Sequence, residues 1–260
     1  MNSGSNGPKY DRKLLLAGEK RDAVIDLSEV QRYGTESWGN PDYVHIYGLK
    51  PADWHAKGIR ILGRTAVECT RDELADDIAK DIAAIAKAAP QSSSDAFVVD
   101  PFTGSGNTLY WIVRHLSGAH GLGFELDPAV FQLTRQNITT LGLPIEVSHR
   151  DYRVGLQEIR IEPGQLVVAF IAPPWGDALN KSTGLDLRLT TPPIAEIVDL
   201  LVDVAGSNPL LCAIQIYETL NPASLVELTR RFSWSSQRLY DRNASGENHG
   251  ILLGRCGWVP

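Results

Sequence analysis

The stretch that decides the fold reads Val98-Val-Asp-Pro-Phe-Thr-Gly-Ser-Gly-Asn-Thr108. Its apolar start predicts a short strand over residues 97–102, and Asp100 brings a carboxylate to the tip of that strand. Gly104 and Gly106 let the backbone turn tightly and approach a ligand closely before a helix begins at Asn107. The stretch therefore predicts a strand, a ligand-binding turn and a helix.

Downstream of this turn, apolar runs of strand length alternate with segments of helical period. This alternation is typical of a parallel sheet with helices on both faces, and the most apolar run, residues 166–171, is expected at its centre. We expect an α/β, Rossmann-like fold with a mostly parallel, seven-stranded sheet. Its predicted strands are 97–102, 121–126, 145–149, 166–171, 210–217, 236–241 and 251–257, and its predicted helices are 107–116, 128–140, 193–205 and 222–232.

Upstream of the turn, the sequence divides into three parts. Residues 1–10 are rich in Ser, Gly and Asn and are expected to form a disordered tail. Residues 11–69 contain many aromatic side chains whose spacing between 33 and 55 fits neither a helix nor a strand, so we expect an ordered accessory cap. An aromatic layer packed on the main domain is the open alternative. The main domain is expected to cover residues 70–260 and to begin with a helix capped by Thr70 and Glu73.

Composition limits the classes of function. Hydrophobic residues make up 43% and charged residues 22% of the chain, which is ordinary for a soluble globular protein. Neither a membrane span nor a secretory signal is recognised, and Cys69, Cys212 and Cys256 lack the spacing of a zinc site, so we expect a cytoplasmic protein without a metal. The net charge of −6 without a Lys/Arg block favours a small substrate or a single nucleotide end over general nucleic-acid binding.

Acidic residues follow the first three predicted strands. Asp100 suits a ligand that carries an ammonium group, and Glu125 lies where an acid can accept both hydroxyls of a ribose, about 20 residues after the glycines. Leu109 stands where a dinucleotide fingerprint would have a third glycine, which disfavours a dinucleotide. Asp127 is interpreted as a helix N-cap. Asp151 either meets an adenine amine or is a solvated turn residue.

The segment Ala172-Pro-Pro-Trp-Gly176 ends the most apolar strand. Pro173 and Pro174 fix φ and remove two N–H donors, which aims the Ala172 carbonyl into the cleft to accept a hydrogen bond from a planar amino group. Trp175 offers a stacking face, worth roughly 1–3 kcal/mol for a base. A turn with a packed tryptophan is the alternative.

Together these motifs resemble class I S-adenosylmethionine-dependent methyltransferases, and among them the RNA cap guanine-N2 methyltransferases, the trimethylguanosine synthase-like family. The resemblance covers about residues 68–193 and rests on the Glu68-to-Ala75 segment, the Asp100-to-Gly106 turn, Ala172-Pro-Pro-Trp-Gly and Leu185-Asp-Leu-Arg-Leu-Thr-Thr-Pro192. It implies the class I methyltransferase form of the Rossmann-like fold, with S-adenosyl-L-methionine as cofactor. It places Thr70 near the cofactor carboxylate, and gives Trp175 and the Ala172 carbonyl the stacking and amine-holding roles.

Two departures from that family favour a small acceptor over an RNA cap. Ala172 lacks a side-chain acceptor, and Asp177 replaces a glycine and brings negative charge beside the pocket. We therefore expect methylation of a planar amino nitrogen on a guanine- or purine-like, or other aromatic, small substrate, with no membrane partner. The predicted catalytic residues are Ala172, Pro173, Pro174 and Trp175, and the predicted cofactor-binding residues are Thr70, Asp100, Phe102, Thr103, Gly104, Gly106, Asn107, Thr108, Glu125, Asp151 and Ala172.

Three other functions stay open. The chain could methylate an RNA cap or another guanine at a structured RNA end. It could be a biosynthetic O- or C-methyltransferase, with His249 or Glu218 as base. It could also be a non-catalytic module that binds the cofactor.

Overall fold

The structure, a computed structural model, describes residues 10–89, 95–240 and 249–258. The predicted tail lies outside the described residues except for Tyr10. The Ser-rich segment 91–95, which the sequence predicts to be a loop, also lies outside them except for Asp95. Tyr10 is buried, and its hydroxyl donates a hydrogen bond to Glu29. The expectation that the tail extends to residue 10 was therefore wrong, because a buried aromatic ring anchors that residue.

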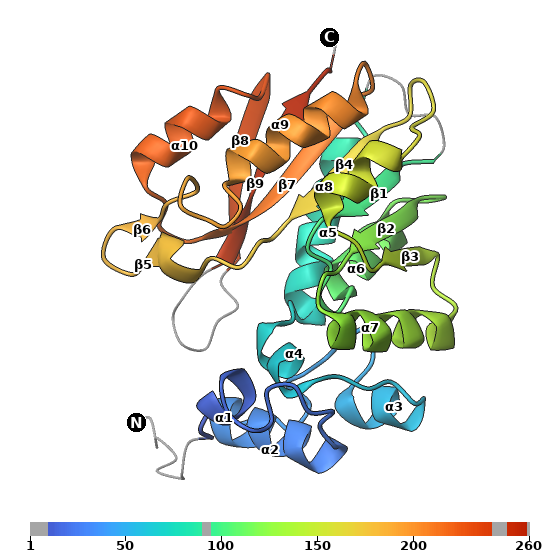
Figure 1. Cartoon of the computed structure of the whole chain (residues 1–260), viewed down its shortest axis with the longest axis vertical. Helices are drawn as coiled ribbons and strands as arrows, with labels where there is room; N and C mark the ends of the chain where they lie inside the picture. Colours follow the sequence, from blue (N-terminus) through green and yellow to red (C-terminus); the bar gives the residue numbers. More distant parts are fainter. Residues whose placement is uncertain (1–9, 90–94, 241–248, 259–260) are drawn as a thin grey trace.

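The described strands form a seven-stranded sheet in the order β3-β2-β1-β4-β7-β9-β8 (Figure 1). Strand β9 alone runs in the direction opposite to the other strands of this sheet, so the prediction of a mostly parallel Rossmann-like sheet is confirmed. The most apolar strand, β4, lies in the middle, fully buried as predicted. The strands are β1 (Phe97–Asp100), β2 (His120–Phe124), β3 (Ile145–Ser148), β4 (Val167–Ile171), β7 (Leu210–Tyr217), β8 (Trp234–Tyr240) and β9 (His249–Cys256).

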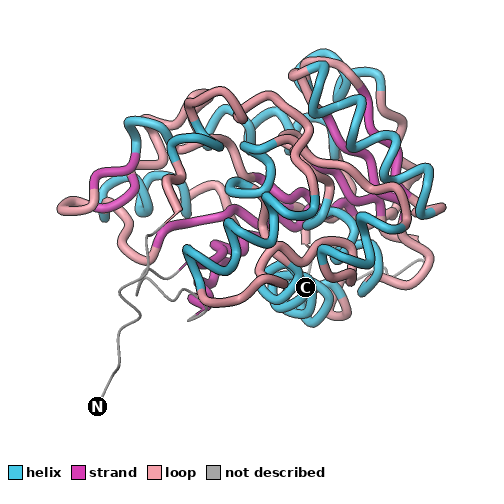
Figure 2. The backbone as a smooth tube through the Cα atoms, turned by 90° about the horizontal axis from the view of Figure 1, so that it is seen from below, coloured by secondary structure: helices cyan, strands magenta, loops and turns pink. Residues whose placement is uncertain are grey.

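Helices cover both faces of this sheet (Figure 2). Side chains of a strand alternate between faces, so Val167, Ala169 and Ile171 pack into one core while Val168 and Phe170 pack into the other. The first core is covered by α8 (Tyr152–Gly155), α9 (Ile194–Ala205) and α10 (Pro222–Thr229), and the second by α5 (Asp72–Ala86), α6 (Asn107–His115) and α7 (Pro128–Leu141).

The N-terminal residues form a helical body with its own core, at the lower end of the molecule in Figure 1. Its helices are α1 (Lys13–Leu16), α2 (Leu27–Trp38), α3 (Pro51–Ala56) and α4 (Gly63–Glu68). The interpretation of residues 33–55 as irregular was wrong at both ends, because α2 and α3 extend into that segment. Asp26 caps α2 by accepting a hydrogen bond from the Glu29 N–H, and Tyr33 and Trp54 are fully buried. The boundary at residue 70 stays a prediction.

The predicted cap by Thr70 is also wrong. Helix α5 begins at Asp72, with Arg71 in the capping position and no side-chain cap. The Thr70 carbonyl instead accepts a hydrogen bond of 2.8 Å from Asn107 Nδ2. The Asp72 carboxylate accepts bonds from Trp111 Nε1 at 2.7 Å and from the Gly48 N–H at 2.9 Å. Residues distant in the sequence therefore determine where α5 begins, and the predicted cap by Thr70 and Glu73 does not form.

Candidate active site

The acidic and aromatic site residues meet at one edge of the sheet because the strands before them are parallel. Asp100 ends β1, Glu125 follows β2, and Ala172 follows β4. Tyr217 ends β7 at the same edge. Open α/β sheets bind their ligands outside the carboxyl ends of the strands, so this edge is the candidate site.

The glycine turn leaves room for a ligand beside its backbone. Gly104 and Gly106 have φ of +52° and +74°, values that side chains other than glycine rarely adopt. A Cβ at Gly104 would have no neighbour nearer than 4.0 Å, so the space beside it is open. The Gly106 N–H closes the turn with a 2.8 Å bond to the Thr103 carbonyl.

Two carboxylates, the buried Asp100 and the partly exposed Glu125, face this turn. Asp100 is 2% exposed and accepts a hydrogen bond of 2.9 Å from the Phe102 N–H. Burial, with a smaller contribution from the nearby Glu125, raises its pKa to about 7 against the lowering effect of that bond. Burial also raises the pKa of Glu125, whose oxygens accept N–H bonds from Gly104 at 3.0 Å and Asp127 at 2.8 Å. A cationic ligand would relieve the desolvation of both groups.

The close contact between helix and strand is supplied by a glycine on the strand. Leu109, at the position of a third turn glycine, is fully buried in α6. A Cβ on Gly121 of β2 would come within 2.9 Å of Val113 and 3.1 Å of Leu109. In a dinucleotide fingerprint, the third glycine allows the helix to pack closely on the strand. In this chain Gly121, on the strand, allows that close packing instead.

Several predicted cofactor residues make bonds within the protein. Both polar atoms of the Asn107 side chain are used, because Oδ1 accepts the Tyr47 N–H at 2.6 Å and Nδ2 donates to Thr70. Thr103 Oγ1 donates to the Asp100 carbonyl at 3.1 Å, and the Phe102 ring packs on Tyr152 at 5.2 Å. Thr108 is buried. These residues therefore stabilise the shape of the glycine turn through contacts within the protein.

Asp127 and Asp151 both cap helices. Asp127 Oδ1 accepts the N–H groups of Ala129 and Val130 at 3.0 Å each, so its interpretation as an N-cap is confirmed. Asp151 accepts the Arg153 N–H at 2.9 Å and pairs with the Arg153 guanidinium. That pairing keeps the pKa of Asp151 below its usual range. The structure thus gives Asp151 the geometry of a turn residue as well as a place at the site edge.

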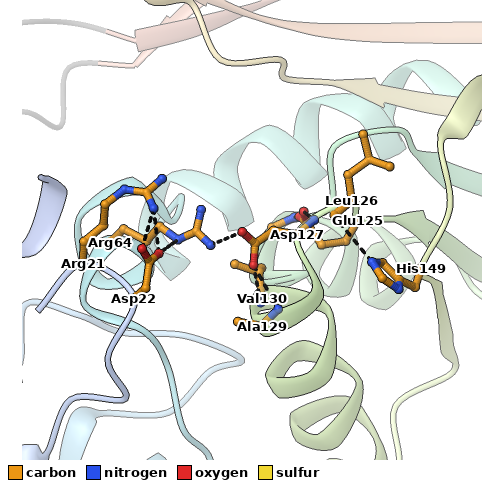
Figure 3. Close-up of polar contacts among 10 residues, drawn as sticks. Arg21, Asp22, Arg64, Glu125, Leu126, Asp127, Ala129, Val130 and His149 are labelled. Carbon is orange, nitrogen blue, oxygen red and sulfur yellow. Dashed lines mark hydrogen bonds and ion pairs between the residues drawn. The ribbon is translucent and has the colours of Figure 1, made fainter.

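A ladder of ion pairs connects the N-terminal body to the turn after β2 (Figure 3). Arg64, from α4, pairs with Asp127 at 2.5 Å and with Asp22 at 3.1 Å, and Arg21 also pairs with Asp22. Glu125 lies two residues before Asp127 and bonds to its N–H. The ladder therefore holds the N-terminal body against the predicted ribose-binding carboxylate.

Beside the carboxylates, a cavity of about 330 Å³ opens between the N-terminal body and the sheet. Asp100 and Glu125 do not line it, so it is a neighbouring compartment and not the cofactor turn itself. Residues from three regions line it. They are Arg12, Tyr33, Trp38, Tyr43, Ala66 and Val67 from the N-terminal body, Glu68, Cys69, Thr70, Arg71 and Leu74 around the start of α5, and Trp175, Leu179, Gln215, Tyr217, Tyr240 and His249 from the sheet side.

Aromatic rings form much of the cavity wall. Trp175 packs at 6.1 Å from Tyr217 and 5.4 Å from His249. On the side of the N-terminal body, Trp38 and Tyr43 are stacked, with centroids 4.6 Å apart and planes within 9°. The sequence pointed to Trp175, but it did not show that Trp38 and Tyr43 share its cavity. Their clustering with other aromatic residues was the only signal.

The Ala172-Pro-Pro-Trp turn is followed by a small hairpin. Pro173 is buried and Pro174 exposed, while Ala172 and Trp175 are partly exposed. The strands β5 (Leu179–Asn180) and β6 (Gly184–Leu185) pair antiparallel directly after the turn. Leu179 and Trp175 both line the cavity, so the hairpin contributes to the same wall.

Within the described ranges, no group of three or more His, Cys, Asp or Glu side chains is arranged to hold a metal ion. No helix in that part of the chain combines the length and apolar character that crossing a membrane requires.

Comparisons with known proteins give similarity in structure only. No protein-family model matches the chain, and a sequence search of curated proteins finds no match. A human methyltransferase 10 domain containing protein is 13% identical over 72% of this chain and 84% of its own, with a TM-score of 0.49. A putative O-methyltransferase from Klebsiella pneumoniae is 12% identical over 78% and 86%, at 0.48, and an rRNA methylase from Streptococcus thermophilus is 16% identical over 70% and 95%, at 0.43. At TM-scores below 0.5 these similarities carry no inference, and the fold assignment rests on the strand order.

Proposed function

We propose that the chain is an S-adenosylmethionine-dependent methyltransferase that acts on a planar amino nitrogen of a purine-like or other aromatic small acceptor. The observation that carries the proposal is the pairing of two compartments at one sheet edge. One has a glycine turn with the carboxylates of Asp100 and Glu125, and the other is an aromatic cavity that contains Trp175.

The residues of the first compartment fit the cofactor. S-adenosylmethionine carries an ammonium and a sulfonium group, and it supplies an activated methyl group when bound. Asp100 would pair with the ammonium group, and Glu125 would accept the ribose hydroxyls. The open space beside Gly104 lets backbone and ligand approach closely. An ammonium group beside Asp100 would offset the desolvation that raises the pKa of this carboxylate.

The second compartment suits a flat acceptor. Trp175 would stack on the ring, and the Ala172 carbonyl would hold the amine and orient its lone pair. The guanidinium of Arg71 lies 3.8 Å from the centre of the Tyr43 ring and also lines the cavity, which favours an acceptor with an anionic substituent such as a nucleotide. Positioning and exclusion of water would supply most of the rate enhancement.

A second candidate has an observation in its favour. His249 lines the cavity and packs on Trp175, where a base for an oxygen or carbon acceptor would be needed. A guanine in a structured RNA end is a further candidate acceptor, and a module that binds the cofactor without transfer is the alternative outside the enzymes. A cytoplasmic location and a catalytic domain over residues 70–260 are part of the same proposal.

A methyl-transfer screen tests these candidates. Free nucleotides, RNA cap analogues, aromatic amines and phenols are each incubated with labelled cofactor, and the products are identified by mass spectrometry. Transfer to an amine at a rate that changes little between 50 and 200 mM salt, roughly the range over which polyanion binding collapses, supports the proposal. Transfer to phenols alone, a steep fall with salt, or cofactor binding without any product would contradict it.

A further inference from the structure

The cavity contains one carboxylate for which the proposed function has no role so far. Glu68 is the last residue of α4 and lines the cavity together with Trp175. Across the described residues, its carboxylate makes no hydrogen bond and no ion pair, whereas Asp22, Asp127 and Asp151 are all paired. The side chain of Glu68 is exposed at the cavity wall, so its carboxylate is accessible to a ligand bound beside Trp175.

The surroundings of Glu68 make it a stronger base than an ordinary carboxylate. Desolvation at the cavity wall raises its pKa, and Asp22 and Glu125 raise it further, against the lowering effect of Arg64 and Arg21. Its place at the carboxyl end of a helix also disfavours negative charge. The other charged or titratable groups around this cavity are Arg12, Arg71, Cys69, His249 and the tyrosines 33, 43, 217 and 240.

We infer that Glu68 accepts a hydrogen bond from the acceptor amine and removes its proton during methyl transfer. This inference rests on the proposed function. As the N–CH₃ bond forms, the S–CH₃ bond of the sulfonium breaks and the sulfur keeps its electron pair. The proton that the methylated nitrogen then carries passes to a Glu68 oxygen and from there to water. The sum is a methylated amine, S-adenosylhomocysteine and one proton.

Glu68 suits this role better than His249. The two residues line the same cavity, but His249 is packed against the rings of Trp175 and Tyr217. Glu68, in contrast, is close enough to Glu125 for their charges to interact, which places it toward the cofactor side of the cavity.

The test compares Glu68→Gln with the wild type, His249→Gln and a matched control, Glu146→Gln, which alters an exposed carboxylate on β3. The acceptor is the best of guanosine monophosphate, adenosine monophosphate and p-aminobenzoate. Glu68→Gln should lower kcat at least 100-fold and remove its rise with pH at the acidic end. Cofactor affinity should stay within twofold of wild type by calorimetry.

A second measurement does not depend on turnover. The same acceptor is titrated into the complex with S-adenosylhomocysteine between pH 5 and 8. Wild-type affinity should rise as Glu68 ionises and becomes a full hydrogen-bond acceptor. Glu68→Gln should lack this rise and should keep only the pH dependence that the acceptor's own groups and Asp100 give to both proteins. A wild type that methylates none of the three acceptors would refute the proposed function, and this inference with it. A wild type that turns over while Glu68→Gln keeps its rate and pH profile, or instead loses cofactor affinity, would refute the inference alone.

Discussion

Replacing Asp100 by Asn should stabilise the protein without ligand and at the same time weaken its binding of cofactor. The asparagine Oδ1 can still accept the Phe102 N–H that Asp100 accepts at 2.9 Å. What the substitution removes is a buried charge. The pKa of Asp100 rises from 3.8 to about 7 on folding, and that difference corresponds to about 4 kcal/mol of unfolding free energy.

The sign of the pH dependence follows from linkage. Below about pH 4, Asp100 is protonated in both states, and its full contribution to stability is present. Between that pH and about 7, the unfolded chain loses the proton while the folded protein keeps it, so stability falls as pH rises. Above about pH 7 both states are ionised and the loss is complete.

Urea unfolding of both proteins at pH 5 and pH 8 measures the effect. At pH 8, Asp100→Asn should be more stable than the wild type by roughly 2–4 kcal/mol, and at pH 5 by only about 1–2 kcal/mol. With saturating S-adenosylmethionine at pH 8, the order should reverse, because the cofactor stabilises only the protein that binds it tightly. The reasoning is refuted if the difference at pH 8 is absent, or if it is equally large at pH 5.

Three further changes test the site. Glu125→Ala should weaken cofactor binding at least tenfold, about 1.4 kcal/mol by calorimetry, and an unchanged dissociation constant would contradict its role. Trp175→Ala should abolish most turnover of the aromatic acceptor while cofactor affinity stays intact, and Trp175→Phe should keep part of the activity. A destabilised Trp175→Ala protein with a normal Michaelis constant would instead show that the ring only packs. Asn107→Ala should lower the unfolding free energy by roughly 1–3 kcal/mol, because it leaves the Tyr47 N–H and the Thr70 carbonyl without their partner. Equal urea midpoints for Asn107→Ala and the wild type would show that these two hydrogen bonds do not stabilise the folded protein.

The centre of the sheet could be predicted because β1, β4 and β7 are mainly apolar runs, and β4 is apolar at every position. The two strands β5 and β6 could not be predicted, since pairs of two residues carry no periodic signal. Helix α2 was missed for a different reason. Its buried side is formed by Val30, Tyr33 and Gly34, and a glycine in mid-helix weakens the apolar stripe that identifies a helix.

In the candidate site, too, some residues could be placed from the sequence and others could not. The residues at strand ends, Asp100, Glu125 and Trp175, could be placed because parallel strands end at one edge. The far wall of the cavity could not, since Trp38 and Tyr43 reach it through the folding of the N-terminal body and not through any local pattern. The bonds of Asn107 were equally hidden, because its partners Tyr47 and Thr70 are distant along the chain.

Asn107 also determines how this molecule can be re-engineered. One side chain ties together the N-terminal body at Tyr47, the start of α5 at Thr70 and the first residue of the helix after the glycine turn. A foreign N-terminal body grafted onto this sheet would break that joint unless it offered a backbone N–H at the place of Tyr47. Point changes at Trp38 and Tyr43, which lie outside the joint, alter the cavity wall and leave the joint whole. The cavity wall is therefore open to gradual change by substitution, whereas exchange of the whole N-terminal body requires the hydrogen bond from the Tyr47 N–H to Asn107 to be rebuilt.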